Sequence, residues 1–227
     1  MNLITIDFET YFDKEYTLKK LTTEAYIRDP RFEVLGVSIK HGDAPATWFR
    51  DPKEAFAGLD WPSISVLCHN TVFDGAILAW HYGVTPKFWF DTMSMARPYF
   101  GQTIGVSLAA LAKEYNLPEK GGVLASISGL HASELSPSQW SELSDYCIHD
   151  TELCYSIFKK LVKQFPKQEL PVIDTTVRMF TEPMLELDVP LLEEHYNKVM
   201  NDKAALLERA GLTRETIMSN NLFAEVL

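Results

Sequence analysis

The sequence predicts an α/β fold in which a mixed β-sheet is flanked by helices and followed by a C-terminal helical appendage. Three short segments rich in β-branched or other apolar residues predict strands that pair as an antiparallel meander: residues 3–10, 33–40 and 46–49. A further apolar strand over residues 63–68 runs directly into an amphipathic helix pattern over residues 71–82. This strand–turn–helix unit is typical of α/β sheets.

Two of the predicted helices carry clear start signals. Asp51 is placed as an N-cap before Pro52, and this short helix ends near Gly58. Ser136 caps a much longer helix, with a proline at its first position, and the apolar pattern continues to about Gln164. The remaining elements are a strand over 88–90, helices over 92–97 and 107–115, and a glycine-rich segment over 118–130 that we interpret as a mobile loop.

The end of the chain predicts the helical appendage. Residues 170–179 and 191–210 have amphipathic patterns, and the second pattern ends at Gly211, a typical residue after a helix C-terminus. We therefore expect a main domain over residues 1–165 and a helical extension over residues 166–227. The apolar stripe of this extension is expected to favour self-association if it is left exposed.

Composition narrows the class of protein. Hydrophobic residues make up 46% of the 227 positions, enough for a substantial core, and no stretch approaches the ~20 apolar residues of a spanning helix. With no secretory signal pattern, we expect a cytoplasmic location and no membrane partner. The three cysteines, Cys68, Cys147 and Cys154, lack C-x-x-C spacing and are expected to be buried free thiols. The formal charge of −10 disfavours binding of nucleic acid by phosphate neutralisation alone.

The first strand ends in two carboxylates on one face. With a period of two, Asp7 and Glu9 point the same way, while Phe8 points to the opposite, core side and anchors them. Like charges this close repel each other, and a divalent cation is the usual remedy. The alternative for this pattern taken alone is an exposed strand end with solvated acids.

Two later segments supply further candidate ligands. Asp74 lies in the first turns of the helix that follows the strand at 63–68, so it faces the edge where open α/β sheets build their sites. Tyr146 and Asp150 are four residues apart on the Ser136 helix and share one helix face, roughly 6 Å from each other. Taken singly, an acid near a helix start, a core tyrosine and a solvated aspartate are the alternatives.

The four acids together predict a two-metal site. Asp7, Glu9, Asp74 and Asp150 carry about four negative charges, which two divalent cations flanking a phosphodiester would balance. Because all of these ligands are carboxylates, hard ions such as Mg²⁺ or Mn²⁺ are expected.

Three motifs resemble those of a known enzyme superfamily. They occur in the order and structural context of the tyrosine branch of DEDD-superfamily 3′-to-5′ exonucleases: Asp7-Phe8-Glu9-Thr10, then Asn70-x-x-Phe73-Asp74, then Tyr146-x-x-x-Asp150. The resemblance implies a ribonuclease H-like sheet. The histidine branch would place its base where Asp145 stands, so His149 and His69 are interpreted as structural or exposed histidines.

The regions around these motifs are similar to bacteriophage-type family A DNA polymerases. The segments that carry this similarity are 18–20, 25–27 and 30–37, then 169–188 and 219–224, where the exonuclease of those polymerases gives way to the thumb. This resemblance implies a proofreading module that acts on single-stranded or frayed 3′ DNA ends, with a polymerase in cis or in trans, located in the host cytoplasm if the protein is phage-encoded. The chain contains none of the catalytic motifs of the polymerase itself.

The resemblance also implies a role for each residue. Asp7, Glu9 and Asp150 would hold one metal, Asp7 would bridge to a second metal near Asp74, and Tyr146 would orient water. Contacts with the terminal nucleotides are expected from Thr10, Asn70 and Phe73. The candidates for stacking on bases are Phe12, Phe73 and Tyr99, with core packing as the favoured alternative for each. Two other functions stay open: a free-standing exonuclease acting on RNA, and a non-catalytic nucleic-acid-binding or scaffolding module that keeps the fold.

Overall fold

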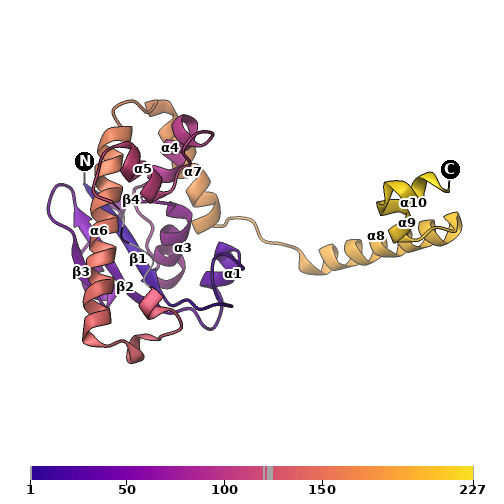
Figure 1. The fold of residues 1–227 in the computed structure, drawn as a ribbon, viewed down its shortest axis with the longest axis horizontal. Coiled ribbons are helices and arrows are strands. Elements are labelled where there is room, and N and C mark those ends of the chain that lie inside the picture. The colour runs from indigo at the N-terminus through magenta and orange to yellow at the C-terminus, as the bar shows by residue number, and fades with distance from the viewer. Residues whose placement is uncertain (1, 120, 122–124, 227) are drawn as a thin grey trace. The chain divides into compact units, whose positions relative to one another are not determined.

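The computed structural model describes residues 2–119, 121 and 125–226, which divide into two compact units, Met1–Pro183 and Met184–Leu227. The first unit contains a β-sheet with helices on both faces (Figure 1). The second unit is helical. No helix in the described part of the chain is both long and apolar enough to cross a membrane.

The described residues form a mixed, five-stranded sheet. Its strands are β1 (Leu3–Thr10), β2 (Val34–His41), β3 (Thr47–Phe49), β4 (Ser65–Cys68) and β5 (Phe88–Asp91). Their spatial order is β3-β2-β1-β4-β5, with antiparallel pairing from β1 through β2 to β3 and parallel pairing from β1 through β4 to β5. The predicted meander and the predicted strand–turn–helix unit are both confirmed, and they meet at β1.

Helices cover the sheet and make up the second unit. Those of the first unit are α1 (Thr23–Ile27), α2 (Pro52–Phe56), α3 (Thr71–Tyr82), α4 (Thr92–Phe100), α5 (Leu108–Glu114), α6 (Pro137–Leu161) and α7 (Leu170–Thr181). Those of the second unit are α8 (Val189–Ala210), α9 (Arg214–Met218) and α10 (Asn220–Ala224). Short 3₁₀ turns lie at Trp61–Ser63, Ala125–Ile127, Ala132–Glu134 and Lys167–Glu169.

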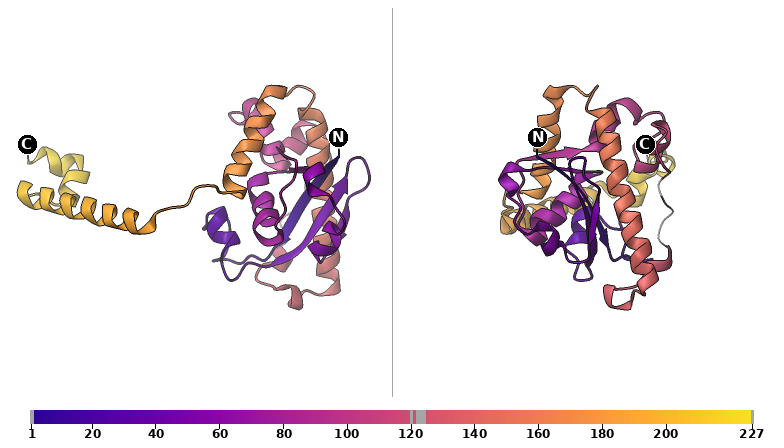
Figure 2. Two further views of the ribbon diagram at one scale, coloured as in Figure 1. Left: turned by 180° about the vertical axis from the view of Figure 1, so that it is seen from behind. Right: turned by 90° about the vertical axis from the view of Figure 1, so that its left-hand side faces the viewer.

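Strand β1 separates two parts of the core. Ile4, Ile6 and Phe8 belong to a buried cluster on the face covered by α3 and α7, whereas Leu3 belongs to a second cluster beneath α4, α5 and α6. Figures 1 and 2 show α6 crossing one face of the sheet and α3 on the other. The odd-numbered side of β1, which carries Asp7 and Glu9, therefore faces α6.

The helix signals are confirmed at the start of α2 and of α6. The Asp51 carboxylate accepts from the Lys53 main-chain N–H, and Ser136 forms a capping box with Gln139. Helix α4 is longer than predicted, because the proline at position 98 lies inside it and the helix continues to Phe100. Helices α1, α9 and α10 were not predicted, since each has only five residues and no resolvable amphipathic period.

The described part of the segment over residues 118–130 packs against the rest of the first unit. Ile127 is 2% exposed and packs with Leu35 and Leu143. The Gly129 main-chain N–H donates to the Phe12 carbonyl at 2.8 Å. No local pattern indicated this packing, because the partners lie far away in the sequence; the mobility of the segment stays a prediction. Residues 120 and 122–124 of the segment lie outside the described residues.

The second unit carries the predicted apolar stripe. Helix α8 begins at Val189 and ends before Gly211, whose backbone is left-handed, and Leu192, Tyr196 and Val199 are about half exposed. The division of the chain into 1–165 and 166–227 stays a prediction; helix α7 belongs to the first compact unit, where it packs against α3 and β5.

A substitution of Gly36 tests how tightly β2 is packed beside the end of β1. This glycine pairs with Glu9 across the sheet, and a Cβ atom built on it would lie 2.3 Å from the Trp48 ring and 2.7 Å from the Phe49 carbonyl oxygen. We expect Gly36→Ala to lower the free energy of unfolding by about 1–3 kcal/mol, the usual cost of overpacking. Chemical denaturation measures this, with Thr47→Ala at an exposed position of β3 as the control. Equal stability of both variants would contradict the close packing.

Candidate active site

The end of β1 presents Asp7 and Glu9 side by side. Both side chains are partly exposed and lie opposite Ser38 and Gly36 of β2, respectively. Between them, Phe8 points into the core, where its ring contacts the rings of Phe56 and Tyr82 at centroid distances of 6.2 and 6.0 Å. The predicted alternation is confirmed, because the acids and the buried ring lie on opposite faces of the strand.

Helix α3 brings a third carboxylate to this point. Asp74 lies in the first turn of α3, and its Oδ1 accepts a hydrogen bond of 3.1 Å from the Phe8 main-chain N–H. The side chain is only 3% exposed. Burial raises the pKa of Asp74 well above its ordinary value, and the neighbouring Asp7 carboxylate raises it further.

The turn between β4 and α3 is held by an acid that sequence reasoning missed. Asn70 has a left-handed backbone with φ of 71°, and its main-chain N–H donates to Asp91 Oδ1 at 2.9 Å. The same oxygen accepts from the Met93 N–H, and Asp91 Oδ2 accepts from the Ser94 hydroxyl. Asp91 is thus both the N-cap of α4 and a support for the turn that leads to Asp74. The signal was an aspartate directly after an apolar strand and before a helix.

Helix α6 closes the site from the other face of the sheet. The Cys147 thiol, which is fully buried, donates to the Asp7 main-chain carbonyl at 3.2 Å and lies 3.4 Å from Asp7 Oδ2. Tyr146 precedes this cysteine and Asp150 follows it by three residues, so both lie close to the same side of the helix. Asp150 is 3% exposed and Tyr146 is half-buried.

Glu119 and Gly121 lie beside the same turn of α6. A Cβ atom at Gly121 would lie 3.2 Å from the Tyr146 ring, so a glycine allows the chain to pass close to the phenol. The His149 Nε2–H donates to the Glu119 carbonyl at 2.8 Å. His69 contacts Thr92 through Nδ1 at 2.8 Å.

A cavity of about 530 Å³ opens next to Glu9. It contains two of the three predicted substrate-binding residues, Thr10 and Phe73, and also Phe12; the third, Asn70, is not part of its lining. Further lining residues include Lys14, Thr17, Leu18, Lys19 and Tyr26. Tyr99, the remaining stacking candidate, lines a separate apolar cavity with Phe165 and Val172.

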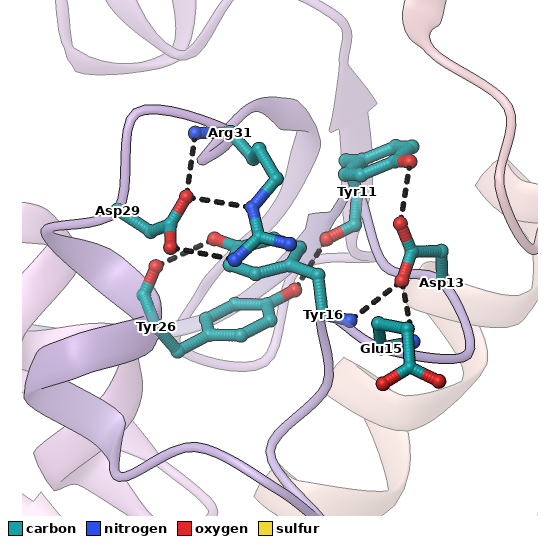
Figure 3. Close-up of polar contacts among 7 residues, drawn as sticks. All are labelled: Tyr11, Asp13, Glu15, Tyr16, Tyr26, Asp29 and Arg31. Atoms are coloured by element: carbon teal, nitrogen blue, oxygen red, sulfur yellow. Dashed lines mark hydrogen bonds and ion pairs between the residues drawn. The ribbon is translucent and has the colours of Figure 1, made fainter.

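The wall of this cavity is fixed by a network of polar contacts that follows β1 (Figure 3). The Tyr26 hydroxyl donates to the Tyr11 carbonyl, and the Tyr16 hydroxyl donates to the Tyr26 carbonyl at 2.5 Å. Asp13 Oδ1 accepts from the Tyr16 main-chain N–H at 2.5 Å. Thr10 is held in the same place, since its hydroxyl lies 2.9 Å from the Tyr26 hydroxyl.

The residues present fit a divalent-metal site. A buried carboxylate, Asp74, stands beside the partly exposed Asp7, an arrangement that a bound cation stabilises. The Asp7 and Glu9 oxygens and the Cys147 sulfur all lie within 4.8 Å of one another. The assignment of Asp7, Glu9, Asp74 and Asp150 as ligands stays a prediction, and the structure brings the first three to one edge of the sheet.

The substitution Asp74→Asn tests whether repulsion among the carboxylates of the site lowers the stability of the fold. The pKa of Asp74 is higher in the folded protein than in the unfolded chain. This residue therefore stabilises the fold at low pH, and the stabilisation is lost as the pH rises above 3.8, the ordinary pKa of an aspartate. Asparagine keeps an oxygen for the Phe8 N–H but carries no charge. The thermal midpoint of the metal-free variant should therefore gain on the wild type as the pH rises, and Mn²⁺ should stabilise the variant less.

Thermal melts between about pH 4 and pH 8, with chelator and then with Mn²⁺, measure both differences. Asp60→Asn, at an exposed position, is the matched control. A difference between Asp74→Asn and wild type that stays constant with pH would contradict the proposed repulsion.

Comparison with solved structures identifies the fold. NrnC from Brucella melitensis shares 18% identity over 80% of this chain and 82% of its own, with a TM-score of 0.56. RNase D from Trypanosoma brucei shares 14% identity over 82% of this chain and 66% of its own, with a TM-score of 0.60. RNase D from Escherichia coli shares 18% identity over 84% of this chain, with a TM-score of 0.58, and the chain spans about half of it, 47%. These similarities confirm the ribonuclease H-like arrangement of a mixed sheet flanked by helices.

No curated protein sequence matches this chain. A family model described as 3′-5′ exonuclease matches residues 2–166. The matched range includes the carboxylates of β1 and α3 and the whole of α6. The chain therefore belongs to the 3′-5′ exonuclease family of the DEDD superfamily.

Proposed function

We propose that this chain is a metal-dependent 3′-to-5′ exonuclease that releases nucleoside 5′-monophosphates from single-stranded 3′ ends. The observation that carries the proposal is the Asp74 carboxylate, which is buried and hydrogen-bonded to the main chain between Asp7 and Glu9. A protein without a cationic ligand gains nothing from this clustering of negative charge.

Asp7, Glu9 and Asp150 would hold one divalent ion, and Asp7 together with Asp74 would hold the second. Mg²⁺ and Mn²⁺ suit these carboxylate oxygens. When bound, the pair of ions would activate the attacking water and stabilise the charge on the leaving 3′ oxygen. Asp7 is central to this assignment because it stands between Asp74 and the Cys147 turn of α6.

Tyr146 would orient the attacking water through a hydrogen bond from or to its phenol. A phenol has an ordinary pKa of about 10 and is a weak base near neutral pH, so its contribution is positional. Its half-buried ring, against which Gly121 lies, is consistent with a fixed position beside the site.

The cavity beside Glu9 would receive the terminal nucleotides. Phe73 and Phe12 offer rings for stacking, and Lys14 and Lys19 place two cations within an otherwise acidic protein. Stacking and phosphate contacts of this kind do not read sequence. We therefore expect trimming of 3′ ends irrespective of base sequence.

Asp7→Asn tests the catalytic assignment. Losing this carboxylate would remove a ligand shared by both ions, so Mg²⁺-dependent release of mononucleotides from a 3′-labelled single strand should be abolished. The metal-free protein should melt at the same temperature or higher, because repulsion is relieved. Full activity of the variant would refute the site, and a wild-type protein that binds but does not cut would favour the non-catalytic alternative.

The comparisons support RNA as the substrate class more than a role in polymerase proofreading. The Trypanosoma brucei RNase D structure contains RNA U12, a Brucella melitensis NrnC structure contains pGG, and the Escherichia coli protein is described as an exoribonuclease. One NrnC structure also contains Mg²⁺. We accordingly propose an exonuclease that acts without a polymerase, with RNA ends as its preferred substrates; the resemblance to phage polymerases supports DNA ends as the second candidate.

Matched RNA and DNA oligonucleotides of one sequence separate these two candidates. We expect faster Mn²⁺- or Mg²⁺-dependent shortening of the RNA strand from its 3′ end, because a 2′-hydroxyl adds a hydrogen-bonding group for the protein. Single-turnover rates on 5′-labelled strands measure the ratio, and Asp7→Asn purified in parallel controls for contaminating nucleases. DNA cut as fast as or faster than RNA would favour the proofreading module.

A further inference from the structure

Helix α8 repeats apolar residues at the spacing of a coiled coil. It has 22 residues, about three heptads, and counting from Val189 in alternate steps of three and four residues gives positions a and d of each heptad. These positions form one row along the helix, which we call the α8 seam: Val189, Leu192, Tyr196, Val199, Lys203, Leu206 and Ala210. The large apolar side chains of the seam are between 47% and 61% exposed. A row of this length is typical of a helix that pairs with another helix.

Lys203 is the charged residue of the seam, and it decides the direction of pairing. If two copies of α8 paired in parallel, the two Lys203 ammonium groups would face each other in one layer and repel. In an antiparallel pair that sets Tyr196 level with Val199 of the second copy, Lys203 lies level with Leu192 instead. The two lysines are then separated by roughly 16 Å along the helix axis. The seam therefore favours an antiparallel pair.

The charged residues beside the seam complement each other in this antiparallel register. Asp188, His195, Asp202 and Arg209 recur every seventh residue on one flank, at position g of the heptad. The register places Asp188 beside Arg209 of the second copy and His195 beside Asp202, and two-fold symmetry makes each contact twice. A shift by one heptad in either direction would instead bring Asp202 against an aspartate of the second copy. The charges therefore select one register.

The other flank of the seam supplies a match of shape. A hollow of about 510 Å³ on α8 is lined by Leu192, Glu193, Tyr196 and Asn197. In the same register, Met200 of the second copy lies beside Glu193, because both residues occupy position e. Met200 is 46% exposed, and the unbranched side chain of a methionine adapts to an irregular hollow. Each copy therefore offers a hollow and the side chain that fills it.

We propose that the α8 seam binds the α8 seam of a second copy of this chain, as a two-fold antiparallel coiled coil. The second copy is the occupant because the seam, the flanking charges and the hollow are each complementary to themselves under one two-fold axis. The proposal does not depend on the exonuclease assignment, since α8 carries none of the carboxylates of the candidate active site.

Sedimentation velocity of the full chain measures the association. Over a roughly 100-fold range of protein concentration, we expect one transition from monomer to dimer and no larger species, because a two-fold contact closes on itself.

The substitution Tyr196→Asp tests whether the seam is the contact. A charge without a partner at the centre of the seam should weaken the dimer by at least about 100-fold, since burying such a charge is strongly unfavourable. Asn201→Asp introduces the same side chain on the opposite, exposed face of α8 and should leave the dissociation constant unchanged. Circular dichroism checks that both variants keep the helix content of the wild type.

Cross-linking tests the direction and the register. A chain with Leu192→Cys is mixed with a chain with Lys203→Cys and oxidised, and the products are identified by mass. The antiparallel register predicts a disulfide between the two variants and no disulfide between two Leu192→Cys chains, whereas a parallel pair predicts the reverse. The wild type is the control, because its own cysteines are buried: Cys68, Cys147 and Cys154.

A wild-type chain that stays monomeric, a dimer that Tyr196→Asp leaves intact, or a Leu192→Cys chain that cross-links to itself would overturn the proposal. In the first case, another protein or another segment would be the occupant of the seam. None of these readouts uses nuclease activity. An inactive protein that dimerises would remove the exonuclease assignment and keep the α8 contact, and an active monomer would do the reverse.

Discussion

The hydrogen bond from the Phe8 main-chain N–H to the Asp74 carboxylate is the contact on which the functional end of the sheet depends. It joins residues 66 positions apart and brings a buried acid beside Asp7. The repulsion that results opposes folding, and it is tolerated because Phe8 is buried in the core, where it packs against the ring of Phe56 and that of Tyr82 in α3. The free energy of core packing thus offsets the repulsion between the carboxylates, and a bound cation would reduce that repulsion.

The two faces of β1 contribute differently to this arrangement. On the α3 face, a main-chain donor fixes the carboxylate directly. On the α6 face, the Cys147 thiol fixes a helix to the Asp7 carbonyl, and Tyr146 and Asp150 follow from the helical period. Both hydrogen bonds are made to the backbone of β1. The positions of the acids are therefore set mainly by regular secondary structure.

Much of this was predictable from the sequence because it follows from local periods. Alternation along residues 3–10 separated Asp7 from Phe8, and the Ser136 capping box located α6. The role of Asp91, the contact of Cys147 with Asp7 and the packing of Ile127 depend on partners far away in the chain, and no local pattern encodes them. The choice between RNA and DNA does not follow from the motifs for another reason: the motif carboxylates would act on a phosphodiester, and they carry no information on whether the sugar is ribose or deoxyribose.

Asp91 has a consequence for how sequence variants of this protein should be interpreted. One carboxylate receives hydrogen bonds from the Asn70 turn before α3 and from the first turn of α4, so it couples two crossover connections. A substitution there would shift the start of α3 and displace Asp74 while leaving every motif residue unchanged. A genetic screen for inactive alleles would then recover substitutions of Asp91, although Asp91 belongs to none of the catalytic motifs. Such variants would be inactive because the Asp74 carboxylate is displaced.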